Sequence, residues 1–138
     1  MTDMSSALKI AAAGMRAQSS RMRVIAENVA NAGSTATGPD GQPYRRKIPV
    51  FSEELDRATG VRLVHMSKPI PDASKFRSVY DPEHPAADAK GFVKYPNVNS
   101  MVELMDMREA QRSFEANISV IENSRAMLSR TLELLRSR

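Results

Sequence analysis

The chain lacks cysteine and tryptophan, and only 5% of its 138 residues are aromatic. Without cysteine it can form neither a disulfide nor a thiolate metal site, and it has no cysteine nucleophile. The scarcity of aromatic side chains argues against a large compact core, because these side chains bury much of the apolar surface in most cores. The length allows one domain, or one domain with a projecting module.

Long apolar runs are also missing. No segment approaches the ~20 apolar residues that span a bilayer. The unbroken apolar run near the N-terminus, Ile10 to Ala13, is shorter than the ~7–15 residues of a signal-peptide core. The sequence therefore predicts no membrane-spanning helix and no cleaved general secretory signal. Such a chain stays in the cytoplasm or is exported by another route.

The usual signatures of an enzyme are not found either. The six glycines are dispersed and form no phosphate-binding loop, and the two histidines, His65 and His84, do not form a zinc-binding HExxH pair. The segment from Asp81 to Asp88 is rich in oxygen ligands, but its proline-rich spacing matches no recognised metal site, and a solvated loop is favoured. We expect no catalytic residue, no metal, no cofactor and no small-molecule substrate. A small hydrolase that uses this loop is the enzymatic alternative.

The charge is modest and mixed. The chain has 20 basic and 16 acidic residues, which gives a net charge of +4. The largest basic run, Arg45 to Lys47, is short, and acidic residues are interleaved almost everywhere. A nucleic-acid interface usually concentrates its basic residues on one face, so we expect no nucleic-acid partner. The basic run either contacts acidic surfaces of neighbouring proteins or lies on a solvated strand edge.

What the sequence does contain is two apolar stripes, one near each end, with alternating steps of three and four residues. Such stripes indicate helices that pack lengthwise on other helices. The first helix is predicted from about Asp3 to Gly33, and the second from a capping box at Ser100–Glu103 to about Ser137. The stripes comprise Met4, Leu8, Ala11, Met15, Gln18, Met22, Ile25, Val29 and Ala32 in the first helix, and Leu104, Met107, Gln111, Phe114, Ile118, Ile121, Arg125, Leu128, Leu132 and Leu135 in the second.

The middle of the chain has a different pattern. Alternating residues around Ile48–Val50 and Val61–His65 predict strands, with a turn at Ala58–Gly60. Phe76–Tyr80 and Phe92–Tyr95 are short extended candidates, whereas Lys68–Pro71 reads as a loop. The predicted fold is mainly α: long N- and C-terminal helices that pair as an antiparallel coiled coil, with a small β-rich or irregular central insert. The predicted segments are an N-terminal helix in residues 1–33, an insert in 34–96, and a C-terminal helix in 97–138.

Both stripes are thin for helices that stand alone. Each contains small or polar residues, such as Ala11 and Gln18 in the first and Gln111 and Arg125 in the second. We therefore expect the helices to become stable against copies of this chain or related chains, although a self-contained helical hairpin is the simpler alternative. The predicted assembly interface comprises Leu8, Met15, Met22, Ile25, Val29, Met107, Phe114, Ile118, Ile121, Leu128, Leu132 and Leu135.

Two short segments resemble the signatures of the bacterial flagellar rod and hook protein family. Residues 26–32 end the first predicted helix with Ala-Glu-Asn-Val-Ala-Asn-Ala. Residues 96–99 read Pro-Asn-Val-Asn, and the match continues through Glu103 to residues 114–117, where Phe114 departs from a common tyrosine. We expect Asn28 and Asn31 to satisfy backbone groups where the first helix ends. The motif positions are Asn28, Ala30, Asn31, Asn97, Asn99, Glu115, Ala116 and Asn117.

The middle of the chain narrows this resemblance. Residues 38–47, 79–85 and 91–94 are similar to a proximal rod member of the family, and the short insert disfavours the hook protein and the larger distal-rod proteins. Another proximal rod protein is the alternative within the family. A helical nucleic-acid-binding module is the alternative from a different class.

The resemblance implies a structural, non-enzymatic subunit of the proximal rod in the flagellar basal body. Such subunits leave the cell through the flagellar type III export channel without a cleaved signal, assemble helically in the periplasmic rod and transmit motor torque. The implied partners are copies of the chain, other rod proteins, and the membrane-ring and export-gate proteins of the basal body. Insertion into the membrane is not implied.

Overall fold

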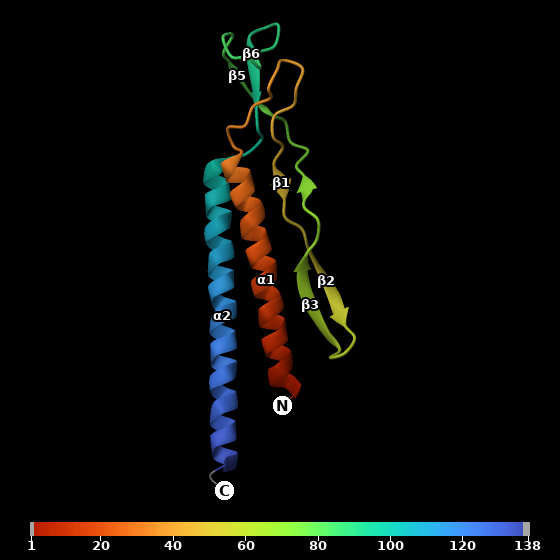
Figure 1. Ribbon diagram of the computed structural model, residues 1–138, viewed down its shortest axis with the longest axis vertical. Helices are drawn as coiled ribbons and strands as arrows, with labels where there is room; N and C mark the ends of the chain where they lie inside the picture. Colours follow the sequence, from red (N-terminus) through yellow and green to blue (C-terminus); the bar gives the residue numbers. More distant parts are fainter. Residues whose placement is uncertain (1, 137–138) are drawn as a thin grey trace. The chain divides into compact units, whose positions relative to one another are not determined.

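The computed structural model describes residues 2–136, with side chains from residue 4 onward. It contains two long helices, α1 (Thr2–Ala30) and α2 (Ser100–Arg136), and the segment that connects them in the sequence forms six short strands (Figure 1). Helices account for 48% of the chain and strands for 18%. The mainly α fold predicted from the sequence is therefore wrong: the chain forms two helices that flank a β-rich central region. No helix among the described residues is long and apolar enough to cross a membrane.

The strands form three separate antiparallel pairs. β1 (Lys47–Ile48) pairs with β4 (Ile70–Pro71), β2 (Phe51–Asp56) with β3 (Val61–Met66), and β5 (Arg77–Tyr80) with β6 (Phe92–Tyr95). The predicted turn at residues 58–60 joins β2 to β3, and Gly60 there has a positive φ of 68°, which favours glycine. The predicted loop at residues 68–71 is wrong at its end, because Ile70 and Pro71 pair with β1.

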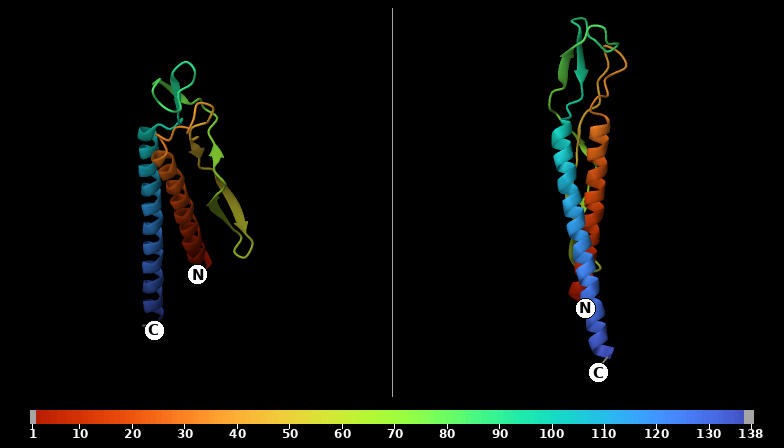
Figure 2. Two further views of the ribbon diagram at one scale, coloured as in Figure 1. Left: turned by 45° about the horizontal axis from the view of Figure 1, so that its top comes forward. Right: turned by 90° about the vertical axis from the view of Figure 1, so that its left-hand side faces the viewer.

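The chain divides into two compact units. Unit 1 contains α1 up to Met22, the hairpin segment Phe51–Ser67, and α2 from Arg108 onward. Unit 2 contains Arg23–Val50 and Lys68–Met107, so it holds the end of α1, the start of α2 and the other two strand pairs. Figure 2 shows two further views of the same elements.

In unit 1, small residues of α1 are buried: Ala11, Ala13 and Ala17 are each at most 3% exposed. The hairpin β2–β3 joins this part of α1 through an ion pair between Lys9 and Asp56, 3.2 Å apart. A cavity of about 700 Å³ lies between Ala13, Ala17 and their neighbours on α1 and residues 54–57 and 63–66 of the hairpin. Few contacts therefore hold the hairpin in place.

The predicted antiparallel coiled-coil seam is also wrong in its second helix. The buried positions of α2 are Glu103, Ala110 and Ser124, whereas the predicted positions one residue later, Leu104, Gln111 and Arg125, are exposed. Met107, Phe114, Ile121 and Leu128, which also belong to the predicted stripe, are half-buried. The apolar pattern missed the inner positions because they are small or polar. We call Glu103, Ala110 and Ser124, together with the half-buried Asn117 at the same seven-residue spacing, the inner stripe of α2.

Candidate functional site: the polar junction

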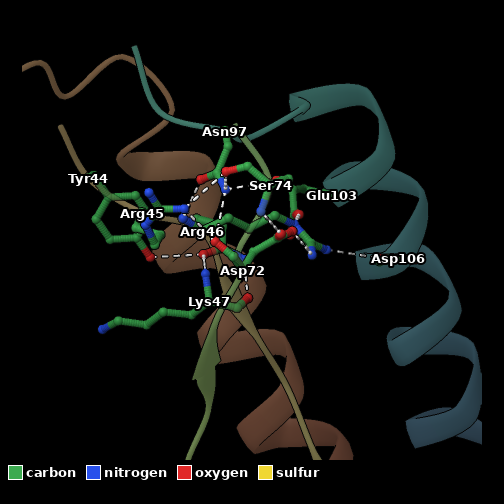
Figure 3. Close-up of polar contacts among 10 residues, drawn as sticks. Tyr44, Arg45, Arg46, Lys47, Asp72, Ser74, Asn97, Glu103 and Asp106 are labelled. Atoms are coloured by element: carbon green, nitrogen blue, oxygen red, sulfur yellow. Dashed lines mark hydrogen bonds and ion pairs between the residues drawn. The ribbon is translucent and has the colours of Figure 1, made fainter. Parts of the chain in front are cut away.

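A group of hydrogen-bonded side chains joins the end of α1, strand β1 and the start of α2 in unit 2 (Figure 3). We call this group the polar junction. The polar atoms of these side chains are bonded to one another and to the backbone. Its members are Asn28, Tyr44, Arg46, Asp72, Asn97 and Glu103.

Asn28, on the last turn of α1, is the first anchor. Its side chain is fully buried, at 0% exposed. The amide nitrogen donates to the carbonyl oxygen of Lys47 at 2.8 Å and to the Glu103 carboxylate at 3.1 Å. The amide oxygen accepts from the Lys47 N–H at 2.9 Å and from the Tyr44 hydroxyl at 2.8 Å. Asparagine suits this position because its side chain carries both a donor and an acceptor group and can pair with the backbone as another strand does.

Asn97, just before α2, holds the neighbouring backbone in a similar way. Its amide oxygen accepts from the Arg46 N–H at 2.8 Å. Its amide nitrogen lies 3.2 Å from the carbonyl oxygens of Asp72 and Ser74, and 2.9 Å from the Ser74 hydroxyl. Asn28 thus binds the backbone of Lys47, at the start of β1, and Asn97 binds the backbone N–H of the preceding residue, Arg46. The two asparagines lie far apart in the sequence.

Glu103 and Arg46 form the charged centre. Glu103 is 1% exposed, and its carboxylate accepts from the Arg46 Nε as well as from Asn28. The Arg46 guanidinium also pairs with Asp72 at 3.3 Å and reaches Asp106 at 3.9 Å. A buried carboxylate is tolerated only when it is paired and hydrogen-bonded, and both conditions are met here.

The charges and burial shift several pKa values. Burial, and then the carboxylates of Glu27 and Glu103, raise the pKa of Tyr44 from 10.0 to about 12. Burial acts to lower the pKa of Arg46, but hydrogen bonding to Glu103 and Asp72 outweighs it and raises that pKa. The backbone N–H and hydroxyl of Ser74, with a contribution from Arg46, lower the pKa of Asp72. At neutral pH the junction therefore holds a neutral tyrosine, a charged arginine and charged Asp72.

The start of α2 differs from its predicted form. The N-cap is Asn99, whose side-chain oxygen accepts from the N–H groups of Met101 and Val102 at 3.1 and 3.4 Å. The capping box predicted at Ser100–Glu103 is wrong, because the Glu103 side chain turns into the junction instead. At the end of α1, Asn31 donates to the carbonyl oxygen of Glu27 at 2.9 Å, as the sequence predicts.

The basic run is used within the chain. Arg45 stacks on the Phe76 ring, 4.1 Å from its centroid, and donates to the Asp72 carbonyl oxygen at 2.6 Å. Lys47 pairs with Glu27, and Arg46 is held in the junction. The charges of this run meet acceptors of the same chain, although the Lys47 side chain remains 42% exposed. A nucleic-acid-binding module needs basic residues that are free to meet phosphates. The three residues of the longest basic run are instead paired within the chain.

In the segment from Asp81 to Asp88, polar side chains accept hydrogen bonds from nearby backbone N–H groups. The His84 Nδ1 accepts from the Ala86 N–H at 3.0 Å, and the Asp88 carboxylate accepts from the N–H groups of Lys90 and Phe92 at 2.8 and 3.0 Å. The two hydrogen bonds to Phe92 and Lys90 lower the pKa of Asp88. Within residues 2–136 we find no group of three or more His, Asp or Glu side chains placed to hold a metal ion.

The structure brings some of the predicted site residues together and leaves others apart. Among the motif positions, Asn28 and Asn97 enter the junction and Asn99 caps α2, while Ala30, Glu115 and Ala116 are exposed. Among the predicted assembly positions, Ile25 is buried, at 1% exposed, whereas Leu132 and Leu135 are 52% and 63% exposed. Nine lie half-buried: Leu8, Met15, Met22, Val29, Met107, Phe114, Ile118, Ile121 and Leu128.

Sequence reasoning missed Tyr44, Arg46, Asp72 and Glu103 as members of one site. The apolar pattern gave no signal for Glu103, because it assigned the next residue, Leu104, to packing. Nothing in the sequence singles out Asp72, because only the pairing of β1 with β4 brings it near Arg46.

Comparison with known proteins gives relatives over nearly the whole chain. Residues 89–134 match the family model described as flagellar basal body rod FlgEFG protein C-terminal. The chain is 47% identical over 137 residues to the flagellar basal-body rod protein FlgC of Agrobacterium fabrum, with 99% of both chains covered. It is 42% identical to the protein of the same name from Escherichia coli O6:H1, with 91% of this chain and 92% of the relative covered. For Aquifex aeolicus FlgC the identity is 38%, with 96% and 98% covered.

Proposed function

The chain belongs to the family of the flagellar basal-body rod protein FlgC, and from this premise we propose that it is a subunit of the proximal rod that transmits motor torque. The resemblance stated from the sequence motifs is thereby confirmed. Membership places the protein in the flagellar basal body, as a structural protein of the rod. Helical assembly, export and torque transmission belong to the proposal.

The observation that carries the proposal is the exposed apolar surface of α2. Large apolar side chains remain in water along this helix, and a soluble monomer rarely exposes so many on one element. They suit contact with neighbouring helices, where their burial would contribute roughly 25 cal/mol per Å². These residues, with exposed fractions of 44–68%, are Met101, Val102, Leu104, Met105, Val120, Met127, Leu132 and Leu135.

The polar junction supports a mechanical role. It fixes the end of α1, strand β1 and the start of α2 through buried hydrogen bonds and the Arg46–Glu103 ion pair. Bending at this point would leave buried donors and charges without partners, which costs about 1–3 kcal/mol for each group. A subunit that transmits torque needs such a stiff connection between its helices and the segment that departs from them.

We expect the partners to be copies of this chain, other rod proteins, and the membrane-ring and export-gate proteins. Export through the flagellar type III channel suits a chain without disulfides. The relatives are structural proteins of the rod, and we propose that this chain likewise has no enzymatic activity, cofactor or small-molecule substrate.

The test is a substitution that spares the isolated chain and blocks assembly. Leu132→Asp changes a side chain that is 52% exposed, so the circular dichroism of the purified protein should be unchanged. In a strain that lacks the native protein, this variant should be exported but absent from isolated basal bodies, and swimming should be lost. Asn123→Asp is the matched control, because it adds one carboxylate at another exposed position of α2. Normal swimming with Leu132→Asp would count against the proposal.

A further inference from the structure

Gly14 lies in the interior of α1, where glycine costs about 1 kcal/mol relative to alanine. The space beside it is taken by Asn117 of α2. A Cβ atom at position 14 would lie 2.9 Å from the Asn117 side-chain oxygen and 3.1 Å from its Cγ. Asn117 is held there by a hydrogen bond from its amide nitrogen to the carbonyl oxygen of Ser113, at 2.9 Å. We call the space beside Gly14 the hole and the Asn117 side chain that fills it the knob.

The inner stripe of α2 meets α1 through pairs of different kinds. Asn117 fills the space at Gly14, and Arg21, with its side chain 17% exposed, reaches Glu109 next to the buried Ala110. In unit 2, Glu103 meets Asn28. Gly14 and Asn28 are separated by fourteen residues on α1, and so are Asn117 and Glu103 on α2. Both contacts therefore follow one antiparallel register, with a different pair at each heptad.

The apolar contacts alone do not select that register. Met107, Phe114, Ile121 and Leu128 recur every seven residues, so a shift of one heptad keeps this apolar row in phase. Such a shift would place Asn117 opposite Ala7 or Arg21, where α1 carries a side chain. Polar or size-matched pairs within an apolar seam are a known way to fix register, at some cost in stability.

We infer that Gly14 and Asn117 determine which residue of α1 lies opposite which residue of α2, and that they exclude a pairing shifted by one heptad. The inference concerns the chain itself, so it stands or falls independently of what the chain assembles with. It assigns a specificity role to two residues whose cost to helix propensity is otherwise unexplained.

Engineered cysteines report the register in this cysteine-free chain. Ala7 and Ser124 lie one heptad beyond the pair, so Ala7→Cys with Ser124→Cys reports the observed register. Ala7→Cys with Thr131→Cys reports the shifted one, because seven residues correspond to ~10 Å along a helix, beyond the reach of a disulfide. In the full-length purified chain, the first pair should oxidise at least about tenfold faster than the second.

The decisive variants exchange the knob and the hole. Gly14→Asn alone places two amides in one space, and the tenfold preference should fall to about threefold or less. Gly14→Asn with Asn117→Gly restores one knob and one hole without changing the glycine and asparagine content of the two helices. The preference should then return, together with most of the loss in unfolding temperature.

Each outcome decides the matter. If the junction alone fixes the register, all variants will keep the tenfold preference and the inference is overturned. If Gly14→Asn fails to fold but the exchanged variant folds, complementarity of the pair is supported. If the exchanged variant fails as completely as Gly14→Asn, or if neither cysteine pair closes selectively in the otherwise native chain, the inference is wrong.

Discussion

The contacts between α1 and α2 are of different kinds in the two units. In unit 2 the contact is polar: Asn28 and Glu103 are fully buried and bonded to each other and to their neighbours. In unit 1 it is mostly steric, with buried alanines on α1 and a glycine against an asparagine. A polar contact requires specific partners, whereas a steric contact requires a matching shape. The junction should therefore be stiff and intolerant of substitution, and unit 1 should tolerate changes that preserve volume.

The hairpin β2–β3 sharpens this contrast. Asp56 joins it to α1 through the ion pair with Lys9, while its apolar residues Phe51, Leu55 and Val64 remain 37–53% exposed. Hairpins usually bury their apolar side chains against the core. Because these side chains stay exposed, the attachment of the hairpin to α1 contributes little to stability. The following predictions test the contrast between the units.

The largest effect is expected in unit 2 from Glu103→Ala. Removing a carboxylate that is 1% exposed takes the buried partner from the Arg46 guanidinium and one of two acceptors from the Asn28 amide. Loss of one member of a buried ion pair costs about 3–5 kcal/mol in free energy of unfolding. Chemical denaturation followed by circular dichroism measures this loss.

The matched control for that substitution is Glu109→Ala in unit 1. Glu109 is also a carboxylate on α2 paired with an arginine, but its side chain is 68% exposed and lies 3.7 Å from Arg21. Its removal should change the free energy of unfolding by less than about 1 kcal/mol. Equal losses for the two variants would contradict the contrast between the units.

Tyr44→Phe should have an intermediate effect. It removes the hydroxyl that donates to Asn28 at 2.8 Å, at a cost of about 1 kcal/mol near neutral pH. The folded pKa of Tyr44 is raised from 10.0 to about 12, so its contribution is present below pH 10 and is lost as the pH rises toward 12. The difference in stability between the native chain and the variant should therefore shrink over that range. A constant difference up to pH 12 would disprove the pKa shift.

Asp72→Asn should reduce sensitivity to acid. The folded pKa of Asp72 is lowered below 3.8 by Ser74 and Arg46. The resulting stability is present above pH 3.8 and is lost as the pH falls through the folded pKa. Urea unfolding from pH 5 down to pH 2 should show a shallower decline for the variant than for the native chain. Identical slopes would show that Asp72 contributes nothing to the acid response.

The smallest effect is expected from Lys9→Ala in unit 1. The Lys9 side chain is 44% exposed and its partner Asp56 is 23% exposed. An ion pair of this kind contributes about 0.2–1 kcal/mol, and less at high salt. The unfolding midpoints of the variant and the native chain should converge as sodium chloride is raised to 1 M. A loss as large as that of Glu103→Ala would show that the hairpin is a principal support of unit 1.

Part of the fold could be predicted from the sequence. The start of the second helix at Ser100, the hairpin turn at residues 58–60 and the strand Phe92–Tyr95 follow from local signals that need no knowledge of distant residues. The first helix was predicted to extend beyond Ala30, where α1 ends, and the predicted end of the second helix at Ser137 lies outside the described residues. The inner stripe could not be predicted, because an apolar pattern highlights Leu104 and Ile118 rather than the neighbouring Glu103 and Asn117. In the junction, the asparagines were singled out by family resemblance, but their contacts with Tyr44 and Arg46 were not predicted.

By itself, the sequence determined where the two helices lie, that strands separate them, and which family the chain resembles. These properties depend on periodicity, turn residues and short motifs, all of which act over a few neighbouring positions. Only the tertiary structure decided which face of α2 is inner and where the charges of Arg46 and Glu103 are neutralised. The reason is physical: a buried polar group is stable only with its partner, and that partner lies far away in the sequence.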